Sequence, residues 1–131
     1  MKLPASSMKN PRLIEYALPG GCTVLVGRTD ADNDYLSLRL ARPDDWWFHV
    51  RGMPGSHVVL QTPPGAEADR EALRQAAAIA AYHSKAREGG VVPVSCTRAR
   101  YVSKPPGAKP GTVEIRKETV LKVRSAEGPR P

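Results

Sequence analysis

The sequence predicts an α+β fold: one domain with a mostly antiparallel sheet, packed by one long Ala-rich helix and one short helix. Three observations predict this class. Short segments rich in β-branched residues recur along the chain, separated by turns that contain Gly or Pro. One long segment, residues 66–87, is dominated by alanine, the strongest helix former. Strands and helices are segregated along the chain rather than alternating, which favours α+β over a parallel α/β fold.

The domain boundaries follow from length and composition. The chain has 131 residues, which suits one domain with a core of its own. We expect residues 1–11 to form a flexible leader, residues 12–124 the domain and residues 125–131 a flexible tail. No apolar run is long enough to span a membrane, and the first residues lack the apolar stretch of a signal peptide. A cytoplasmic protein with no membrane partner is therefore expected, with Cys22 and Cys96 as free thiols.

The first half of the domain is predicted to contain strands around one short helix. The segments RLIEYAL and CTVLVG flank Pro19-Gly20-Gly21, which predicts a hairpin. Asn33-Asp34 offers N-cap chemistry for a short helix over YLSLRLA, residues 35–41. The segments WWFHV and HVVLQ are predicted strands on either side of the Pro54-Gly55 turn.

The second half begins with the predicted helix over residues 66–87. Acidic residues lie in its first turns, basic residues in its last, and Gly89-Gly90 follows its end. Small apolar residues share one face at helical spacing, and these are Ala72, Ala76, Ile79 and Ala80. Two or three further strands are predicted over residues 91–102 and 112–123, with the loop SKPPGAKPG between them.

The strand WWFHVR raises the first functional question. Alternation places Trp46, Phe48 and Val50 on one face, which predicts a core face. The other face carries Trp47, His49 and Arg51. The indole ring of such a set can stack on a nucleobase, and the imidazole and the guanidinium can pair with a phosphate. The alternative is that the second tryptophan caps a core edge while its polar neighbours are merely solvated.

Charge favours a polyanionic partner. The net charge is +7 and the pI is about 9.8. From Thr97 onward nine basic side chains face three acidic ones, a net charge of +6. In the loop, Lys104 and Lys109 are held apart by prolines, and two lysines presented on a stiff loop suit phosphate contact. The alternative is a solvated basic hairpin that protects a sheet edge from aggregation.

Catalytic and metal signatures are weak. Ser56 and His57 are neighbours on a strand and point apart, so they make a poor nucleophile–base pair. The sequence contains no G-x-S-x-G elbow, no P-loop and no C-x-x-C. His49, His57 and Cys96 match no zinc spacing. We therefore expect no cofactor, no metal and no catalytic residues, although a single acid or base near Asp44, Asp45 and His49 stays open.

The segment DDWWFHVRGMPGSHVVL, residues 44–60, resembles the D-[IL]-W-[FL]-H-x-[KR]-x-[IV]-P-G-S-H-V motif of the NFACT-R (DUF814) family. That family belongs to the NFACT ribosome quality-control proteins, historically labelled fibronectin-binding proteins. VLVGRTDADNDYLS, YHSKAR and VPVSCTRARYVSKPPGAKPGTV are similar to three further family segments, in the same order. The departures are Thr29 in place of Asn, Cys96 in place of an aromatic residue and Ser103 in place of a second Lys. The resemblance covers nearly the whole chain after the leader.

The resemblance implies RNA binding. Large family members bind the large ribosomal subunit and recruit tRNA for C-terminal tailing, through further domains that do not fit in this chain. The resemblance thus implies a stand-alone NFACT-R protein that binds tRNA or rRNA, with the large ribosomal subunit among the expected partners. Stand-alone forms have also been linked by context to tRNA modification, including sulfur insertion, yet the sequence offers no sulfur-transfer C-x-x-C.

Three functions stay open from the sequence. The first is an RNA-binding module, the second an RNA-modifying or processing enzyme that uses His49 or His57, and the third a module that docks on a ribosome-associated protein. The oligomeric state is not specified. For the first function, the expected RNA-binding residues are Arg28, Asn33, Asp34, Trp47, His49, Arg51, Ser56, His57, Arg98, Arg100, Lys104 and Lys109.

Overall fold

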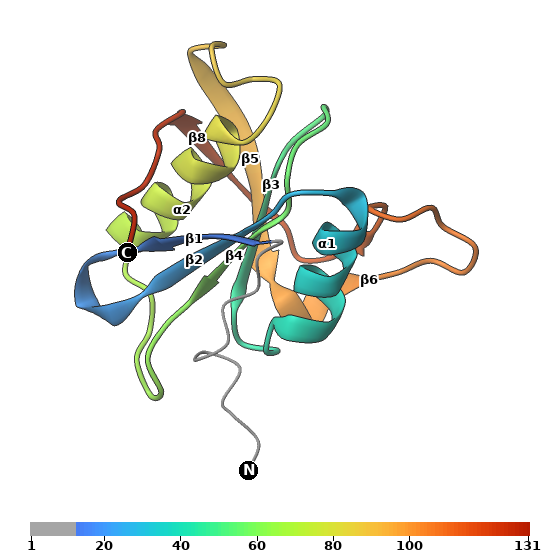
Figure 1. Cartoon of the computed structure of the whole chain (residues 1–131), viewed down its shortest axis with the longest axis horizontal. Helices are drawn as coiled ribbons and strands as arrows, with labels where there is room; N and C mark the ends of the chain where they lie inside the picture. Colours follow the sequence, from blue (N-terminus) through green and yellow to red (C-terminus); the bar gives the residue numbers. More distant parts are fainter. Residues whose placement is uncertain (1–12) are drawn as a thin grey trace.

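The structure, a computed structural model, describes residues 13–131 and is built on a six-stranded antiparallel sheet (Figure 1). The strands lie in the order β1-β2-β4-β3-β5-β8. Their bounds are β1 Leu13–Ala17, β2 Thr23–Gly27, β3 Trp46–Val50, β4 Val58–Gln61, β5 Val91–Arg98 and β8 Thr119–Arg124. With two helices against this sheet, the predicted α+β class is confirmed. The expected leader, residues 1–11, lies outside the described residues.

The predicted hairpin is confirmed, and so are the two strands expected around Pro54-Gly55, but the turn between those strands lies at Arg51 and Gly52 rather than at Pro54-Gly55. The hairpin joins β1 to β2 through the 3-10 turn η2 (Pro19–Gly21), in which Gly20 has φ +81 and Gly21 φ +80. These left-handed conformations suit glycine because it has no Cβ to clash. The two later strands, β3 and β4, pair antiparallel, with Trp47 opposite Val59. Cys22 and Cys96 are both buried free thiols.

The long helix α2 is shorter than predicted and spans Arg70–Tyr82 rather than residues 66–87. It begins late because Asp69 is its N-cap, whose side chain accepts a hydrogen bond from Ala72 N at 2.8 Å. It ends early because the following turn bonds to the β3–β4 turn: Ser56 N donates to His83 O at 3.0 Å. The predicted apolar face is confirmed, since Ala72, Ala76, Ile79 and Ala80 are all buried.

The short helix α1 begins earlier than predicted and spans Asp30–Tyr35. Its N-cap is Thr29 rather than Asn33-Asp34, because Thr29 and Asp32 form a reciprocal capping box with both hydrogen bonds at 3.1 Å. The chain continues directly into a π-helical turn, η3 (Leu36–Leu40), closed by Ala41 N donating to Leu36 O at 2.9 Å. The helix thereby ends in a wider turn than an α-helix would make.

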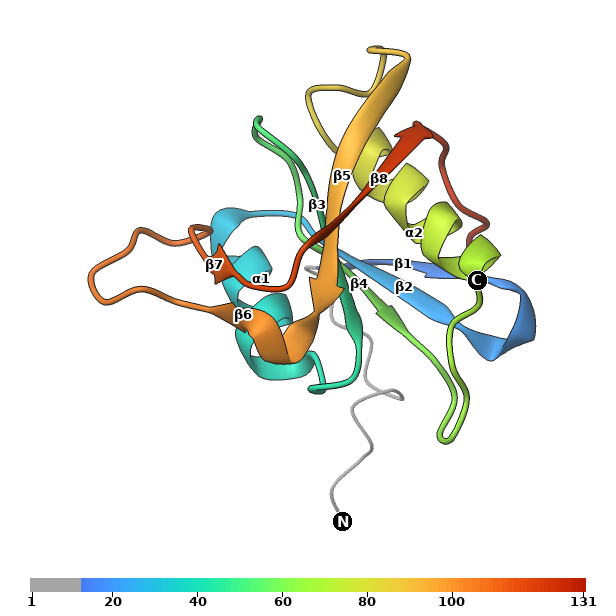
Figure 2. The same ribbon diagram turned by 180° about the vertical axis from the view of Figure 1, so that it is seen from behind.

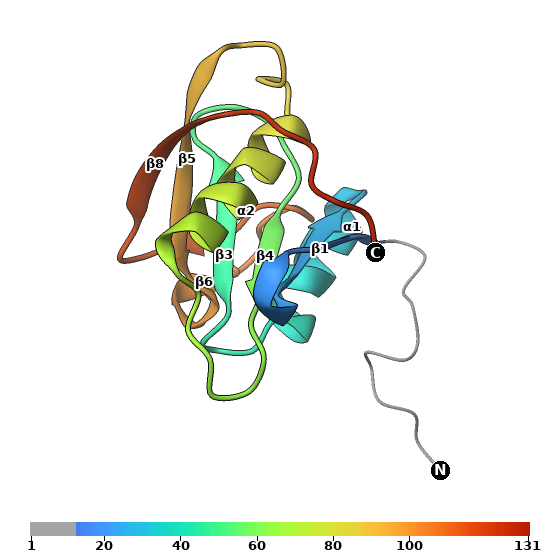
Figure 3. The ribbon, with the colours of Figure 1, turned by 90° about the vertical axis from the view of Figure 1, so that its left-hand side faces the viewer.

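Each face of the sheet packs against a different helix (Figure 3). Helix α2 covers one face, and its alanines pack with Tyr16, Phe48, Val58 and Val94 in the larger core. On the other face, Leu36 of η3 packs with Leu25, Trp47 and Val59 in a smaller core. The alternate residues of β2, β3 and β4 are therefore buried on both sides of the sheet.

The C-terminal third contains four strands rather than two or three. Strand β5 is followed by a 3-10 turn, η4 (Ala99–Tyr101), and then by β6 (Val102–Ser103). Strand β6 pairs with β7 (Glu114–Ile115) as a separate two-stranded ribbon beside α1 (Figure 2). The long loop between β6 and β7 carries the KPPGAKPG segment, so the ribbon places that loop on the α1 side of the sheet.

Residues 125–131 run back along the domain. Ala126 N donates to Ala78 O at 3.2 Å, and Ala17 N donates to Pro129 O at 2.9 Å. The flexibility expected of this tail stays a prediction. Within residues 13–131, no helix is long and apolar enough to cross a membrane.

Candidate nucleic-acid interface

Strand β3 places its two tryptophans on opposite faces, as predicted, but Trp47 does not reach the surface. Its side chain is 3% exposed, and Nε1 donates to Ser37 Oγ at 2.8 Å. Trp46 is half-buried against the larger core instead. The expected surface position of Trp47 is therefore wrong, because η3 covers this part of the sheet.

His57 is the centre of a buried hydrogen-bond network. Its backbone N donates to Asn33 Oδ1 at 3.0 Å, its Nδ1 lies 2.7 Å from Ser37 Oγ, and its Nε2 lies 3.1 Å from Gly111 O. The indole N–H of Trp47 can only donate, so Ser37 Oγ accepts from it and donates its own proton to Nδ1. The carbonyl of Gly111 can only accept, so the proton of a neutral His57 is on Nε2.

Electrostatics agree with a neutral His57. Burial, followed by the neighbouring His49, lowers the pKa of His57 from its ordinary 6.5 to about 4. The half-buried His49 ring stacks on Trp47 with centroids 6.0 Å apart, and burial lowers its pKa as well. Both histidines are therefore uncharged near neutral pH, and neither offers a cation to a phosphate.

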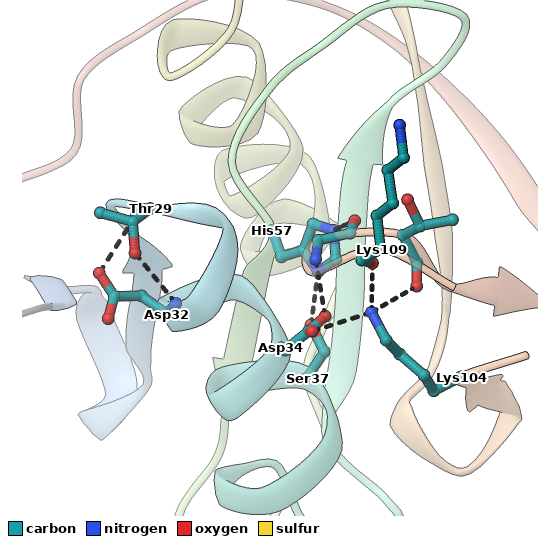
Figure 4. Close-up of polar contacts among 9 residues, drawn as sticks. Thr29, Asp32, Asp34, Ser37, His57, Lys104 and Lys109 are labelled. Atoms are coloured by element: carbon teal, nitrogen blue, oxygen red, sulfur yellow. Dashed lines mark hydrogen bonds and ion pairs between the residues drawn. The ribbon is translucent and has the colours of Figure 1, made fainter. Parts of the chain in front are cut away.

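Lys104 fastens the KPPGAKPG loop to α1 (Figure 4). Its Nζ pairs with Asp34 Oδ2 at 2.9 Å and donates to the carbonyls of Lys109 and Thr112. The second oxygen of Asp34 accepts from Gly111 N at 3.0 Å. Of the two lysines expected to be presented, Lys104 is thus turned inward. The exposed side chain of Lys109 extends away from this network (Figure 4).

Arg98 and Arg100 lie elsewhere: Arg98 is beside the loop that precedes α2, and Arg100 is beside the segment that precedes β3. The Arg98 guanidinium stacks over the Trp46 ring at 3.8 Å and pairs with Glu67 at 3.3 Å. Arg100 pairs with Asp44. Both arginines are therefore already paired with carboxylates. The prediction was that they would be available to bind phosphates.

The remaining predicted residues separate into two places. Arg28 and Ser56 line a cleft beside the turn that follows α2, about 520 Å³ in volume. Arg51 lies at the far end of β3, has a side chain 59% exposed and faces Glu118 at 3.7 Å. The structure thus brings Asn33, Asp34, Trp47, His49, His57 and Lys104 together but leaves the exposed cations apart from one another.

The face of the sheet that η3 covers at β2, β4 and β3 carries exposed cations on β8 and just beyond the end of β3. Val50, Val94, Leu121 and Val123 point toward the larger core. The alternate positions Arg51, Pro93, Lys122 and Arg124 therefore point the other way, and all four are exposed. Arg51 N donates to Pro93 O, and Pro93 is the partner of Lys122 in the β5–β8 register. Arg51, just beyond β3, and Lys122 and Arg124 of β8 thus lie on one solvent-facing surface, with Pro93 of β5 between them.

Comparison with known proteins identifies the family. The model of the NFACT protein RNA binding domain matches residues 14–117. The chain belongs to this family. It is 47% identical over 104 residues to the Rqc2 homolog RqcH of Bacillus subtilis (strain 168), covering 79% of this chain and 18% of that protein. It is 38% identical over 111 residues to the Rqc2 homolog RqcH of Streptococcus suis (strain 05ZYH33), covering 85% and 20%.

A solved structure shares the fold of this NFACT RNA-binding domain. The C-terminal part of the fibronectin/fibrinogen-binding protein from Streptococcus suis superposes with a TM-score of 0.82 at 36% identity. The match covers 92% of this chain and 48% of that one. The chain spans about a fifth of the length of the curated relatives it matches.

The chemistry available to the NFACT RNA-binding domain is that of fixed cations. Among residues 13–131, no three His, Cys, Asp or Glu side chains gather to hold a metal ion. Both ring nitrogens of His57 are engaged within the protein. The arrangement can present positive charge to a phosphate, whereas a buried His57 with both nitrogens bonded is poorly placed to move a proton to or from a substrate.

Sequence reasoning misses several residues of this domain. Ser37 joins Trp47 to His57, and its place one turn after Asn33 is a signal that could have found it. Lys122 and Arg124 contribute to the charge count, but the alternation in TVLKVR also puts them on one face. Lys85 and Arg87 line the same cleft as Arg28, a proximity that no local pattern reveals.

Proposed function

We propose that this domain binds structured RNA, either tRNA or rRNA, as a non-catalytic module in ribosome quality control. The observation that carries the proposal is the match of the NFACT RNA-binding family model to residues 14–117. Relatives named Rqc2 homolog RqcH support the process. The large ribosomal subunit is the proposed assembly partner, and the cytoplasm, where ribosomes work, is the proposed location.

Phosphates are the proposed points of contact. Lys109 is exposed on a fastened loop, and Arg51, Lys122 and Arg124 share the open part of the sheet. Within the part of the chain that the structure describes, Lys109, Lys122 and Arg124 form no ion pair. Such cations can bind a polyanion without breaking ion pairs within the protein. They bind it through charge rather than through the identity of the bases.

The buried network has a positioning role in this proposal. Asn33, Asp34, His57 and Lys104 fix the loop against α1 and β4, and Trp47 and His49 pack behind them. Because these groups bind one another, they would act on RNA through the loop that they hold. Arg98 and Arg100, each paired with a carboxylate, would add less than Lys109 to the affinity.

Paired substitutions test the binding surface. Lys109→Ala with Lys122→Ala should weaken binding of a tRNA and of an rRNA fragment, and should reduce the log–log salt slope by about 1 for each phosphate that the variant no longer binds. Arg70→Ala, which removes one exposed cation at the start of α2, is the control for loss of a surface charge outside this region. The measurement is fluorescence anisotropy with labelled RNA between low and physiological salt. A double variant that binds with wild-type affinity and slope would contradict this surface.

A further inference from the structure

The cleft beside α2 is formed by three segments far apart in the sequence. It has a volume of about 520 Å³ and lies between the turn after α2, the chain before α1 and the β3–β4 turn. Its lining includes Arg28, Ser56, Tyr82, Lys85 and Arg87. A space of this size accommodates a small organic ligand.

The walls of the cleft are fixed by the protein itself. Gly55 and Ser84 form a β-bridge, Ser56 N donates to His83 O at 3.0 Å, and Lys85 N donates to Pro54 O at 3.3 Å. A Cβ at Gly55 would lie 2.9 Å from the Cβ of Ser84, so only glycine permits this approach. The cleft is therefore formed before any ligand arrives.

The charge of the lining selects an anion. Arg28, Lys85 and Arg87 face a single carboxylate, Asp30, which gives a net charge of +2. A second cleft, of about 370 Å³, lies beside Trp46 and has the opposite balance. Its charged lining residues are Arg42, Arg98, Asp44, Asp45 and Glu67, a net charge of −1. Of these two clefts, the one beside α2 is the better receptor for a phosphate.

Arg87 gives the same cleft a flat surface. Its Nε donates to Tyr82 O at 2.8 Å, and its guanidinium lies 3.9 Å from the centroid of the Tyr82 ring. His83 meets Tyr82 edge-on, with ring centroids 5.1 Å apart. The guanidinium plane is thus held in place, and Arg87 is exposed. Nucleobases stack on arginine planes that are held in this way.

We propose that this cleft binds one unpaired nucleotide of the RNA, with its phosphate among the lining cations and its base on the Arg87 guanidinium. The inference rests on the proposed function but adds an interaction that distinguishes unpaired from paired nucleotides in the RNA. The exposed sheet and loop would bind phosphates of paired and unpaired RNA alike, whereas stacking on the Arg87 plane in this cleft requires a base that is free to leave a helix.

Two RNAs test the preference. A hairpin with an unpaired loop and a blunt duplex of equal length are titrated with the full chain. Arg87→Ala should weaken binding of the hairpin by roughly five- to 150-fold, the range for removal of one stacked base, and change duplex binding much less. Arg87→Lys keeps the charge but not the plane and should resemble Arg87→Ala. Arg70→Ala is the control, and spectra of each variant verify that it folds.

A nucleotide titration examines the cleft directly. Adenosine monophosphate should produce saturable amide shifts at Ser56 and Lys85, adenosine or inorganic phosphate alone should bind more weakly, and Arg87→Ala should abolish the effect. Amide shifts confined to residues outside the cleft would overturn the proposal. It would also be overturned if Arg87→Ala bound the hairpin with wild-type affinity while the Lys109→Ala, Lys122→Ala double variant bound it poorly. That last result would leave RNA binding itself intact. If the cleft bound the nucleotide but the protein bound no RNA, the proposed function would be refuted, whereas the cleft would still be a nucleotide-binding site.

Discussion

Trp46 and Trp47 are neighbours in the sequence but differ in burial and bonding. Trp47 is 3% exposed and donates to Ser37, whereas Trp46 is half-buried under Arg98. Trp47→Ala should therefore lower the free energy of unfolding by about 3–5 kcal/mol, the usual cost of removing a buried aromatic side chain. Trp46→Ala should cost less. Urea denaturation of both variants measures the difference, and a larger destabilisation by Trp46→Ala would contradict the assignment.

His57 should make stability depend on pH. Its pKa is about 4 in the folded protein against 6.5 ordinarily, so the unfolded chain binds the proton more readily. The stabilisation is complete above pH 6.5 and is lost as pH falls toward 4, by about 3 kcal/mol in all. His57→Gln should flatten this part of the curve of unfolding free energy against pH. An unchanged slope between pH 7 and pH 5 would show that His57 is not the group responsible.

Residue environments are only partly predictable from the sequence. Alternation along β3 places Trp46 and Trp47 on opposite faces, which the structure confirms. The alternation does not reveal that both faces of β3 are covered, because the residue that covers Trp47 is Leu36, which belongs to the π-helical turn η3. Burial of an alternating strand depends on partners from elsewhere in the chain, and periodicity does not specify them.

At the scale of elements, the loop between β6 and β7 should depend on Lys104. Lys104→Met removes the ion pair with Asp34 and two hydrogen bonds to carbonyls. Amide exchange over residues 104–113 should become faster, above all at Gly111, while the sheet keeps its protection. Lys109→Ala removes a charge from the same loop without touching its attachment and is the control. Equal exchange in wild type and Lys104→Met would exclude the attachment.

Helix boundaries depend on hydrogen bonds that the sequence does not display. The predicted helix continues to residue 87, yet α2 ends at Tyr82 and Ser84 pairs with Gly55. The start of α1 is predictable in principle, since Thr29 and Asp32 have the spacing of a capping box. The cap expected at Asn33-Asp34 is wrong, because both residues lie inside the helix. Local propensity favours a helix in both places, and specific hydrogen bonds fix where each begins and ends.

For the whole molecule, binding to RNA should be strongly salt-dependent. If Arg51, Lys109, Lys122 and Arg124 each contact a phosphate, the log–log slope of affinity against salt should be roughly −2.8 to −3.6. Anisotropy titrations of a tRNA at several salt concentrations measure this slope. Affinity that stays flat from low to physiological salt would exclude a phosphate-based interface.

The fold class is predictable from the whole sequence, but the site is less so. Strand composition and a single long helix indicate α+β correctly, whereas the order β1-β2-β4-β3-β5-β8 requires long-range pairing that no segment reveals. The same holds for the cleft, since Arg28 and Lys85 are far apart in the sequence and line one cleft only in the folded structure. The motifs identify residues that form the network around His57, yet many of those residues hold the molecule together internally.

The attachment of the β6–β7 loop also has a consequence for the speed of binding. The ion pair between Lys104 and Asp34 holds the loop in the folded protein, so the backbone at Lys109 already has its place when RNA arrives. Association then requires no rearrangement of this loop, and its rate should be governed by diffusion and electrostatic attraction. Differences between RNAs should therefore be found in how long each complex lasts. A domain of this kind would sample many RNAs quickly and be retained by few.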